Sequence, residues 1–466
     1  MTVRHVLPPF PLAPSLSAAL LAAVLTACGG GAADAPSSST AATFTVVATP
    51  AETSNADGAK TSGAKAATLK AVATPLPYTA GTIRPNHVSD AVLAQQRVDF
   101  YAQWKKLYVA QECGSGRYFV KVNADGKVVG GGTADATITV SEAHGYGMLI
   151  SVLMADEDSD ARAVFDGMVR FFNDHPASFD AGLMAWNQIK GCGNAGGDKR
   201  GHISATDGDL DIAYALLLAD SKWGSAGAIN YKAEAQRVLS AIMKYEVHPS
   251  GKHLLVGDWA RIDEDRTYEH TTRTSDFMLS HLKAFANASG DAGWLAVRDR
   301  SYAIVDLMQR NFSKTTGLVP DFVYRLDGTP APAAADFFEG PNDGNYSWNA
   351  SRFPWRVAMD YLIYGDSRAL TVLKPLNSWA RTTTRNDPAK FAAGYRLNGR
   401  VSEADYNQLP FVSALGVSAM VDANNQAWLN AIWKDVQAQT LKDNDYYGNT
   451  LKMLGMISMS GRWAKP

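Results

Sequence analysis

The 466-residue chain has few cysteines, little net charge and one long apolar run, and each shortage argues against a class of protein. Its 44 Lys and Arg and 46 Asp and Glu give a net charge of −2, so no basic excess indicates a nucleic-acid partner. After Leu25 no apolar stretch is long enough to cross a bilayer. The two later cysteines, Cys113 and Cys192, have no set of histidines beside them, which argues against structural zinc. We expect neither a metal nor a cofactor.

The N-terminus has the pattern of a targeting segment. Arg4 precedes an apolar stretch over residues 16–25, which ends in Leu25-Thr26-Ala27-Cys28. A short apolar core followed by small residues is typical of a secretory signal. A Cys directly after Leu-Thr-Ala resembles a bacterial lipobox, in which the Cys is lipidated. Residues 1–28 are therefore predicted to be a lipoprotein-type signal peptide with Cys28 as the lipidation site; the alternative is an ordinary signal peptide.

This segment predicts where the protein resides. We expect an exported outer-membrane or cell-surface lipoprotein whose only membrane contact is the lipid anchor, or otherwise a periplasmic or secreted protein. In such an oxidising compartment Cys113 and Cys192 could pair. The sequence alone does not decide whether these two cysteines meet.

Residues 29–81 are rich in Ala, Ser, Thr and Gly and have almost no large apolar side chains. Such a segment buries too little surface to offset its ordering entropy, so we expect a flexible tether. From residue 82 to 466 the composition is that of one folded domain.

Helical periodicity dominates this domain, with a short strand near residues 117–122. The predicted helices lie near 89–107, 142–155, 158–173, 209–220, 228–244, 274–287, 293–312, 350–364, 368–382, 411–420, 424–438 and 445–459. Twelve helices with polar motifs in their connections suit an all-α barrel of six helical hairpins with short strands in the loops. On pattern alone, a solenoid or a plain bundle is the alternative.

Three acidic motifs are candidates for chemistry, and Thr139–Met148 is the first. Glu142 follows Ser141, a residue type that caps helices, and an acid in a first turn is often only a capping acid. Here the neighbours are His144, Tyr146, two glycines and Met148, which is a close-packed apolar setting. Burial there would raise the pKa of the Glu142 carboxyl, as a general acid requires.

The second motif is an acidic run at the start of a helix. Asp207, Asp209 and Asp211 alternate along it, and one Asp would suffice as a cap. Asp207 could cap the helix, Asp209 could face a ligand or support the site, and we expect Asp211 to be structural. The run lacks the spaced oxygen ligands and closing Glu of a calcium loop.

The third motif is the aromatic and acidic loop over residues 336–356, where Gly and Asn mark turns. A loop this aromatic is seldom idle at a surface, although a solvated loop with Asn349 as a helix cap is the simpler interpretation. Elsewhere, Trp186 is either a sugar platform or a core residue, and Asp276 is either a ligand or a cap.

Three segments together resemble glycoside hydrolase family 8. They are SEAHGYGM at 141–148, ATDGDLDIAYALLLADSKW at 205–223 and NASRFPWRVAMDYLIYGD at 349–366. The resemblance implies an (α/α)6 barrel and inverting hydrolysis of β-1,4-linked glycans. It also implies a catalytic acid at Glu142 and a sugar contact at Asp207.

One position departs from the family pattern. Many members have an Asp, the catalytic base, where this chain has Asn349, and an amide cannot take a proton from water. The subgroup with Asn there looks like the chitosanase and lichenase branch, in which a Glu of the preceding loop acts instead. By this resemblance Glu339 is the expected base, with Asp336 and Asp343 as rivals.

The remaining substrate-binding candidates are the residues near these motifs. They are Asp207, Asp209, Tyr146, Trp186, Asp276, Asn349, Arg352 and Asp343. We expect a monomeric endo-β-1,4-glucanase or lichenase acting on a β-linked polysaccharide, with a chitosanase as the close alternative. A polysaccharide lyase and a non-catalytic glycan-binding lipoprotein are the more distant alternatives.

Overall fold

The computed structural model describes residues 78–123, 137–195, 202–261 and 266–466. The predicted signal peptide with Cys28, and nearly all of the predicted tether, lie outside these residues. Tyr78 and Thr79, which we expected in the tether, are already bonded to the folded part. The Tyr78 hydroxyl donates to the Ser458 carbonyl at 2.8 Å, and the Thr79 N–H donates to the Leu362 carbonyl at 2.7 Å. The folded part therefore includes Tyr78, slightly before the boundary that composition indicates.

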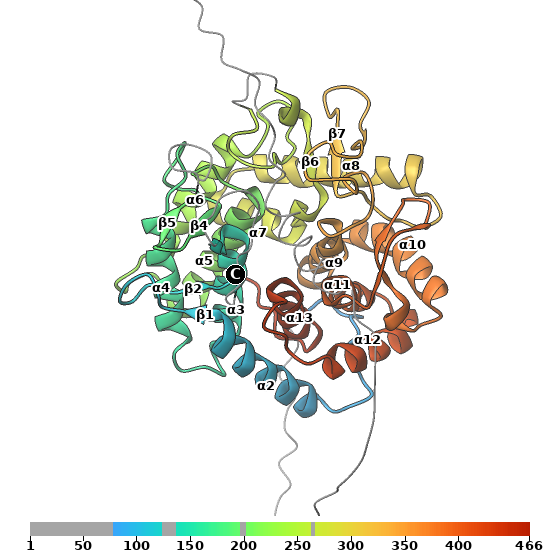
Figure 1. Cartoon of the computed structure of the whole chain (residues 1–466), viewed down its shortest axis with the longest axis horizontal. Coiled ribbons are helices and arrows are strands. Elements are labelled where there is room, and N and C mark those ends of the chain that lie inside the picture. The colour runs from blue at the N-terminus through green and yellow to red at the C-terminus, as the bar shows by residue number, and fades with distance from the viewer. Residues whose placement is uncertain (1–77, 124–136, 196–201, 262–265) are drawn as a thin grey trace, which may run out of the picture. The chain divides into compact units, whose positions relative to one another are not determined.

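Twelve α-helices occur in the described residues, and each overlaps one predicted segment (Figure 1). They are α2 Asp90–Tyr108, α3 Ser141–Leu153, α4 Ala161–Asp174, α5 Thr206–Trp223, α6 Tyr231–Tyr245, α7 Leu279–Ser289, α8 Gly293–Phe312, α9 Phe353–Tyr364, α10 Ser367–Thr384, α11 Leu409–Ala419, α12 Gln426–Ala438 and α13 Tyr446–Met459.

These helices form two concentric layers. Helices α3, α5, α7, α9, α11 and α13 each contact the next, and α13 returns to α3 to close an inner ring. The even-numbered helices lie outside this ring (Figure 1). The arrangement is the predicted (α/α)6 barrel. The inner helices α3 and α11 are buried along nearly their whole length, whereas the outer helix α4 buries one face.

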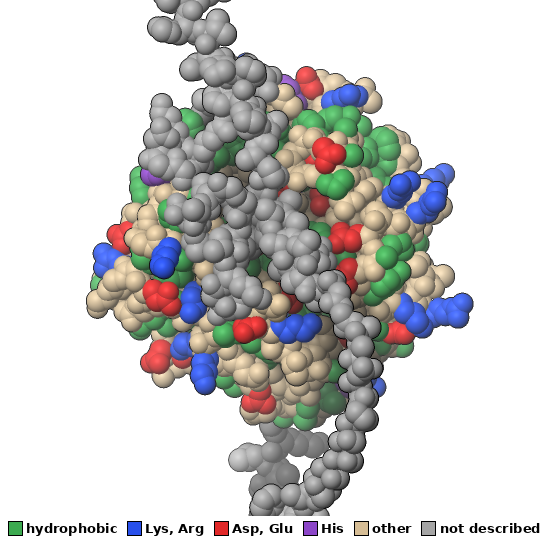
Figure 2. Space-filling model, viewed as in Figure 1, with side chains coloured by type: hydrophobic (Ala, Val, Ile, Leu, Met, Phe, Trp, Pro, Cys, Tyr) green, Lys and Arg blue, Asp and Glu red, His purple; other side chains and the backbone are tan. Residues whose placement is uncertain are grey.

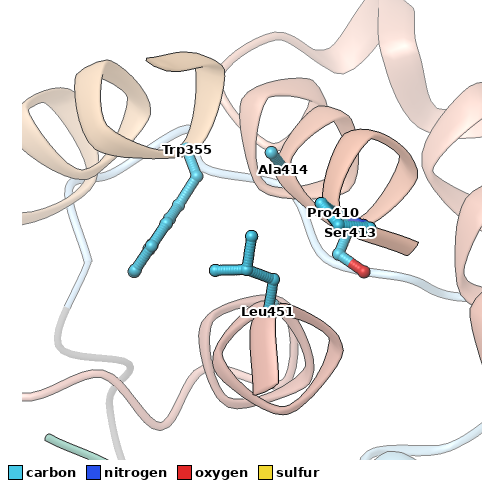
Figure 3. Close-up of a pocket in the computed structure, with 6 residues that line it drawn as sticks. Trp355, Pro410, Ser413, Ala414 and Leu451 are labelled. Atoms are coloured by element: carbon cyan, nitrogen blue, oxygen red, sulfur yellow. The ribbon is translucent and has the colours of Figure 1, made fainter. Parts of the chain in front are cut away.

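Mostly apolar side chains lie between neighbouring inner helices. Trp355 of α9, Ala414 of α11 and Leu451 of α13 line a small pocket between these three helices (Figure 3). At the rim, acidic and basic side chains are interspersed (Figure 2). No helix in the described ranges combines the length and the apolar character needed to span a membrane.

Short antiparallel strands occupy the loops, as expected. They are β1 Val109–Ala110, β2 Phe119–Val120, β3 Thr137–Val140, β4 Asn187–Ile189, β5 Gly193–Asn194, β6 Thr272–Arg273, β7 Phe322–Tyr324, β8 Ala331–Pro332, β9 Ala392–Tyr395 and β10 Val401–Tyr406. Strand β3 pairs with β4 and leads directly into α3. The Ser141 N–H donates to the Trp186 carbonyl at 2.9 Å, so this sheet fixes where α3 begins.

Cys113 and Cys192 form a disulfide with their Cα atoms 5.6 Å apart. It joins the segment after β1 to the turn between β4 and β5. The pairing that the sequence left open is therefore formed, and it ties down the sheet that precedes α3.

Candidate active site

Side chains at the N-terminal ends of four inner helices meet. Glu142 and Asp207 are the second residues of α3 and α5, and Tyr446 is the first residue of α13. Arg352 ends the short 3-10 helix η3 (Ala350–Arg352), which runs directly into α9. Helix N-termini favour carboxylates, because their free N–H groups and dipole are positive there.

Arg352 lies at the centre of this cluster. Its Nη1 donates to Glu142 Oε2 at 2.6 Å, to Asp207 Oδ2 at 2.8 Å and to the Tyr146 hydroxyl at 3.2 Å. Its Nη2 donates to Asn349 Oδ1 at 2.9 Å. One buried guanidinium thus fixes the relative positions of two acids and an amide, a task for which its planar fork is suited.

Glu142 combines burial with a path to solvent, since its side chain is 19% exposed. The Tyr446 hydroxyl donates to Glu142 Oε1 at 3.0 Å. Burial raises the pKa of Glu142 to about 6, although the Arg352 charge opposes the rise. A carboxyl with this pKa holds its proton in mildly acidic solution and can donate it as a general acid.

Asp207, in contrast to Glu142, is held in its ionised form. Arg273 Nη1 donates to its Oδ2 at 3.0 Å, in addition to the bond from Arg352. Burial alone would raise the pKa of Asp207, but the two guanidinium groups hold it below its ordinary value. Asp207 is therefore an anion, suited to accept hydrogen bonds and not to donate a proton.

Glu339 approaches the cluster from the loop before η3. Its Oε2 accepts from Asn349 Nδ2 at 2.7 Å, and its Oε1 lies 3.7 Å from Arg273 Nη2. The side chain is 6% exposed. Glu339 is thus joined to Glu142 by hydrogen bonds that run through Asn349 and Arg352.

The two rivals of Glu339 have other positions. Asp343 accepts backbone N–H groups from Phe338, Glu339 and Gly340 at 2.6, 3.1 and 3.0 Å, so it shapes the turn that carries Glu339. Asp336 is exposed to solvent. Of the three acids of this loop, Glu339 alone has its carboxylate bonded to Asn349.

Asp211 and Arg356 repeat the Asp207–Arg352 pair one helical turn deeper. Arg356 Nη1 donates to Asp211 Oδ1 at 2.8 Å, and His281 Nε2 lies 3.0 Å from the same oxygen. All three side chains are almost fully buried. Asp211 is therefore structural, as its sequence position led us to expect.

Of the two roles that the sequence left open for Asp209, a subsite residue or a supporting residue, its position fits the supporting one. It is fully buried, and its Oδ1 accepts the Met184 N–H at 2.9 Å. Burial raises the pKa of its carboxyl well above the ordinary value, with Glu246 beside it. Asp209 thus supports the loop below the site and is closed to a ligand in this conformation.

Three further predicted residues lie near the cluster. Tyr146 is fully buried against Arg352, and Trp186 is partly buried, with its backbone on the start of α3. Asp276 is fully buried, and burial raises its pKa to about 7 although Arg273 opposes this. In the described part of the chain, no three His, Cys, Asp or Glu side chains are grouped to hold a metal ion.

Two residues of the cluster, Arg273 and Tyr446, are not among the candidates that the sequence offers. The start of the predicted helix 445–459 was the available signal for Tyr446, because Glu142 also lies at a helix start.

A carboxyl group with a raised pKa and a second carboxyl group bonded nearby, on an (α/α)6 barrel, fit the pair of acids that glycosidases use. Residues 78–461 match the family described as "Glycosyl hydrolases family 8". The chain belongs to this family and is a glycoside hydrolase.

Proteins that are similar over most of this chain include glucanases and an endoglucanase. A beta-glucanase of Niallia circulans is 43% identical over 386 residues, which cover 83% of this chain and 89% of that protein. An endoglucanase of Bacillus sp. strain KSM-330 is 36% identical over 392 residues, covering 83% and 80%. The apo structure of a beta-1,3-1,4-glucanase from Paenibacillus sp. X4 is 43% identical with a TM-score of 0.76, covering 84% of this chain and 97% of that one.

Proposed function

We propose that this enzyme is an inverting, endo-acting hydrolase of β-1,4-linked glucan, of the endoglucanase or lichenase type. The observation that carries the proposal is that Glu142 and Glu339 are joined by hydrogen bonds that run through the Arg352–Asn349 pair. The similarity to glucanases over most of the chain supports a glucan as the substrate.

Glu142 is the general acid. It gives its proton to the glycosidic oxygen as the bond from that oxygen to the sugar C1 breaks, so the leaving chain departs as a neutral alcohol. The raised pKa of about 6 supports this role, because the proton is available in mildly acidic solution.

Glu339 is the general base. It takes a proton from a water molecule whose oxygen bonds to C1 from the opposite face of the ring. An inverting enzyme keeps its two carboxyl groups about 6.5–9.5 Å apart to admit this water. The Asn349 Nδ2 donates to Glu339 Oε2 at 2.7 Å and so orients the carboxyl group that accepts the proton.

The surrounding residues hold the sugar and the two acids. Asp207 accepts hydrogen bonds from sugar hydroxyls at the cleavage point, and Trp186 offers an aromatic face for ring stacking. Arg352 is held by its bonds to Tyr146 and Asn349, Asp343 shapes the turn that carries Glu339, and Asp276 lies near the Arg273 charge.

The charges of the site favour a neutral glucan over chitosan. Arg273 and Arg352 compensate Asp207 and Glu142 within the cluster. Because these charges balance, the cluster has no surplus of negative charge to attract a cationic amino sugar.

The test compares reducing-end release from mixed-linkage β-glucan, carboxymethyl-cellulose, xylan and chitosan. Release from the two glucans with the α-anomer appearing first by proton NMR is the expected result. A first product in the β-configuration would contradict inversion, and faster release from chitosan would replace the glucan assignment.

Two variants separate the acid from the base. Glu142→Gln should lower kcat by about 10²–10⁴-fold while oligosaccharide binding remains. Glu339→Ala should lose hydrolysis, and azide should restore turnover by bonding to C1 as the leaving oxygen takes the Glu142 proton, which yields an α-glycosyl azide. Retained hydrolysis by Glu339→Ala without azide would contradict the base assignment.

The proposal extends to the location of the enzyme. Export as a lipoprotein anchored at Cys28 is supported by the sequence around Cys28, with residues 29–77 as a tether to a monomeric catalytic domain that begins at Tyr78. Labelling with a radioactive fatty acid should mark the wild type and spare Cys28→Ser. Equal labelling of both would refute the anchor.

A further inference from the structure

Asp321 has a buried carboxyl group that lies outside the cluster but is bonded to the segment that carries part of it. It precedes β7 and is 5% exposed. Its Oδ1 accepts the N–H groups of Ser347 and Ala350 at 3.0 and 2.7 Å, and its Oδ2 accepts the N–H of Asn349 at 3.3 Å. Three donors from one short segment therefore converge on one side chain.

Through these bonds Asp321 caps the start of η3, a role that the Asn349 side chain would otherwise have. Asn349 is the N-cap residue of η3, and Asn at this position ordinarily accepts a free N–H of the helix through its own side chain. Here the Asn349 side chain makes no such bond. Its amide instead donates to Glu339 and accepts from Arg352.

The backbone of Asp321 ties in another segment. Its carbonyl accepts the Thr274 N–H at 3.0 Å, next to Arg273, and its own N–H donates to the Asn345 carbonyl at 2.8 Å. One residue thus joins the segment that carries Arg273 to the segment that carries Asn349. Both of these residues lie next to the Glu339 carboxylate.

We propose that Asp321 is a positioning residue for the base: by satisfying the N–H groups at the start of η3, it leaves the Asn349 amide free to orient Glu339. This inference rests on the proposed function, in which Glu339 is the base. Asp321 lies behind Asn349 and acts on the water only through Asn349 and Glu339.

The test is the kinetics of Asp321→Ala and Asp321→Asn on mixed-linkage β-glucan. Alanine removes all three acceptors, and kcat should fall about 30–100-fold, since a misplaced catalytic group costs up to about 10²-fold. Asparagine keeps one oxygen for Ser347 and Ala350 but turns a donor toward the Asn349 N–H, and kcat should fall about 3–10-fold. KM should stay within about twofold in both, because the sugar contacts remain.

The matched control is Asp422→Ala. Asp422 accepts the Asn424 N–H at 2.9 Å and caps η5 (Ala423–Asn425), a 3-10 helix that runs directly into α12 just as η3 runs into α9. All variants are assayed at a temperature well below the midpoint of their thermal unfolding. The control should keep its kcat, although it too loses a cap.

Each outcome decides the inference. A kcat of Asp321→Asn within twofold of wild type, a loss expressed in KM, or an equal loss in Asp422→Ala would overturn it. If Asp321→Ala does not fold, Asp321→Asn decides by the same criteria. If Glu339→Gln keeps its activity, the proposed function fails and the inference fails with it; if Glu339→Gln is inactive and the Asp321 variants match wild type, the inference alone fails.

Discussion

Removal of the Tyr446 hydroxyl should move the alkaline limb of the pH profile. This hydroxyl donates to Glu142 Oε1 at 3.0 Å and stabilises the ionised carboxylate more than the neutral acid. Without it, the pKa of Glu142 rises above the wild-type value of about 6. The acid must be protonated to act, so kcat/KM is lost as pH rises through this pKa. In Tyr446→Phe the loss should begin at higher pH.

The size of the shift follows from the strength of the bond. A hydrogen bond to a charged group contributes about 1.5–3 kcal/mol and one to a neutral group about 1 kcal/mol, so the two protonation states differ by about 1 kcal/mol. One pKa unit corresponds to 1.36 kcal/mol, which gives a rise of about 0.7 units. At pH 7 the protonated fraction of Glu142 would then increase from about a tenth to about a third.

The assay is kcat/KM on mixed-linkage β-glucan from pH 4 to pH 9, since this parameter reports the free enzyme. Tyr447→Phe is the matched control: it removes the neighbouring hydroxyl, which donates to the Trp348 carbonyl at 3.0 Å. An alkaline limb that stays in place in Tyr446→Phe, moves to lower pH, or moves equally in the control would refute the reasoning.

Two predictions concern stability. Replacing Cys113 and Cys192 by Ser should lower the free energy of unfolding by about 2–4 kcal/mol, because the disulfide closes a long loop with a sequence separation of 79; urea unfolding measures this, and an unchanged midpoint would contradict it. Asp211→Ala should cost about 3–5 kcal/mol, because it leaves the Arg356 charge buried without its carboxylate partner. The control Asp299→Ala removes an exposed carboxylate that pairs with an arginine at the surface, and it should cost under about 1 kcal/mol in the same assay. Equal costs for the two variants would refute the burial argument.

The helices could be predicted from the sequence because an (α/α)6 barrel repeats one simple pattern. Outer helices alternate apolar and polar faces, and inner helices are apolar nearly all round, so both produce recognisable segments. The predicted starts of α7 and α9 are too early. Residues 274–276 and 350–352 form 3-10 turns before these helices. The N–H groups of Thr274 and Ala350 donate to Asp321, a tertiary contact that the local sequence does not reveal.

The acidic run at the start of α5 places its first two aspartates on different sides of the helix. Asp207 and Asp209 are two residues apart on a helix, so their side chains point about 200° apart around its axis. Only one of them can face the cleft, and it is Asp207. Alternation along the sequence suggests a common face, as it would on a strand, but on a helix it separates the two acids.

Contacts between segments that are far apart in the sequence cannot be predicted from local sequence patterns. Tyr446 and Glu142 are 304 residues apart, and neither motif points to the other. The same holds for Arg273, which reaches Asp207 from a segment 66 residues away. Such partners follow from the closure of the inner ring, which brings the helix starts together.

The two Asp–Arg pairs show how one side-chain combination acquires two roles. Asp207 and Asp211 are one turn apart on α5, and Arg352 and Arg356 are one turn apart across η3 and α9, so the pairs form two parallel levels. The deeper pair is closed in the core, where His281 also contacts Asp211, and it holds the helices in register. The upper pair adds the partly exposed Glu142, the acid of the proposed mechanism. A depth of one helical turn therefore separates a structural ion pair from the pair in the proposed active site.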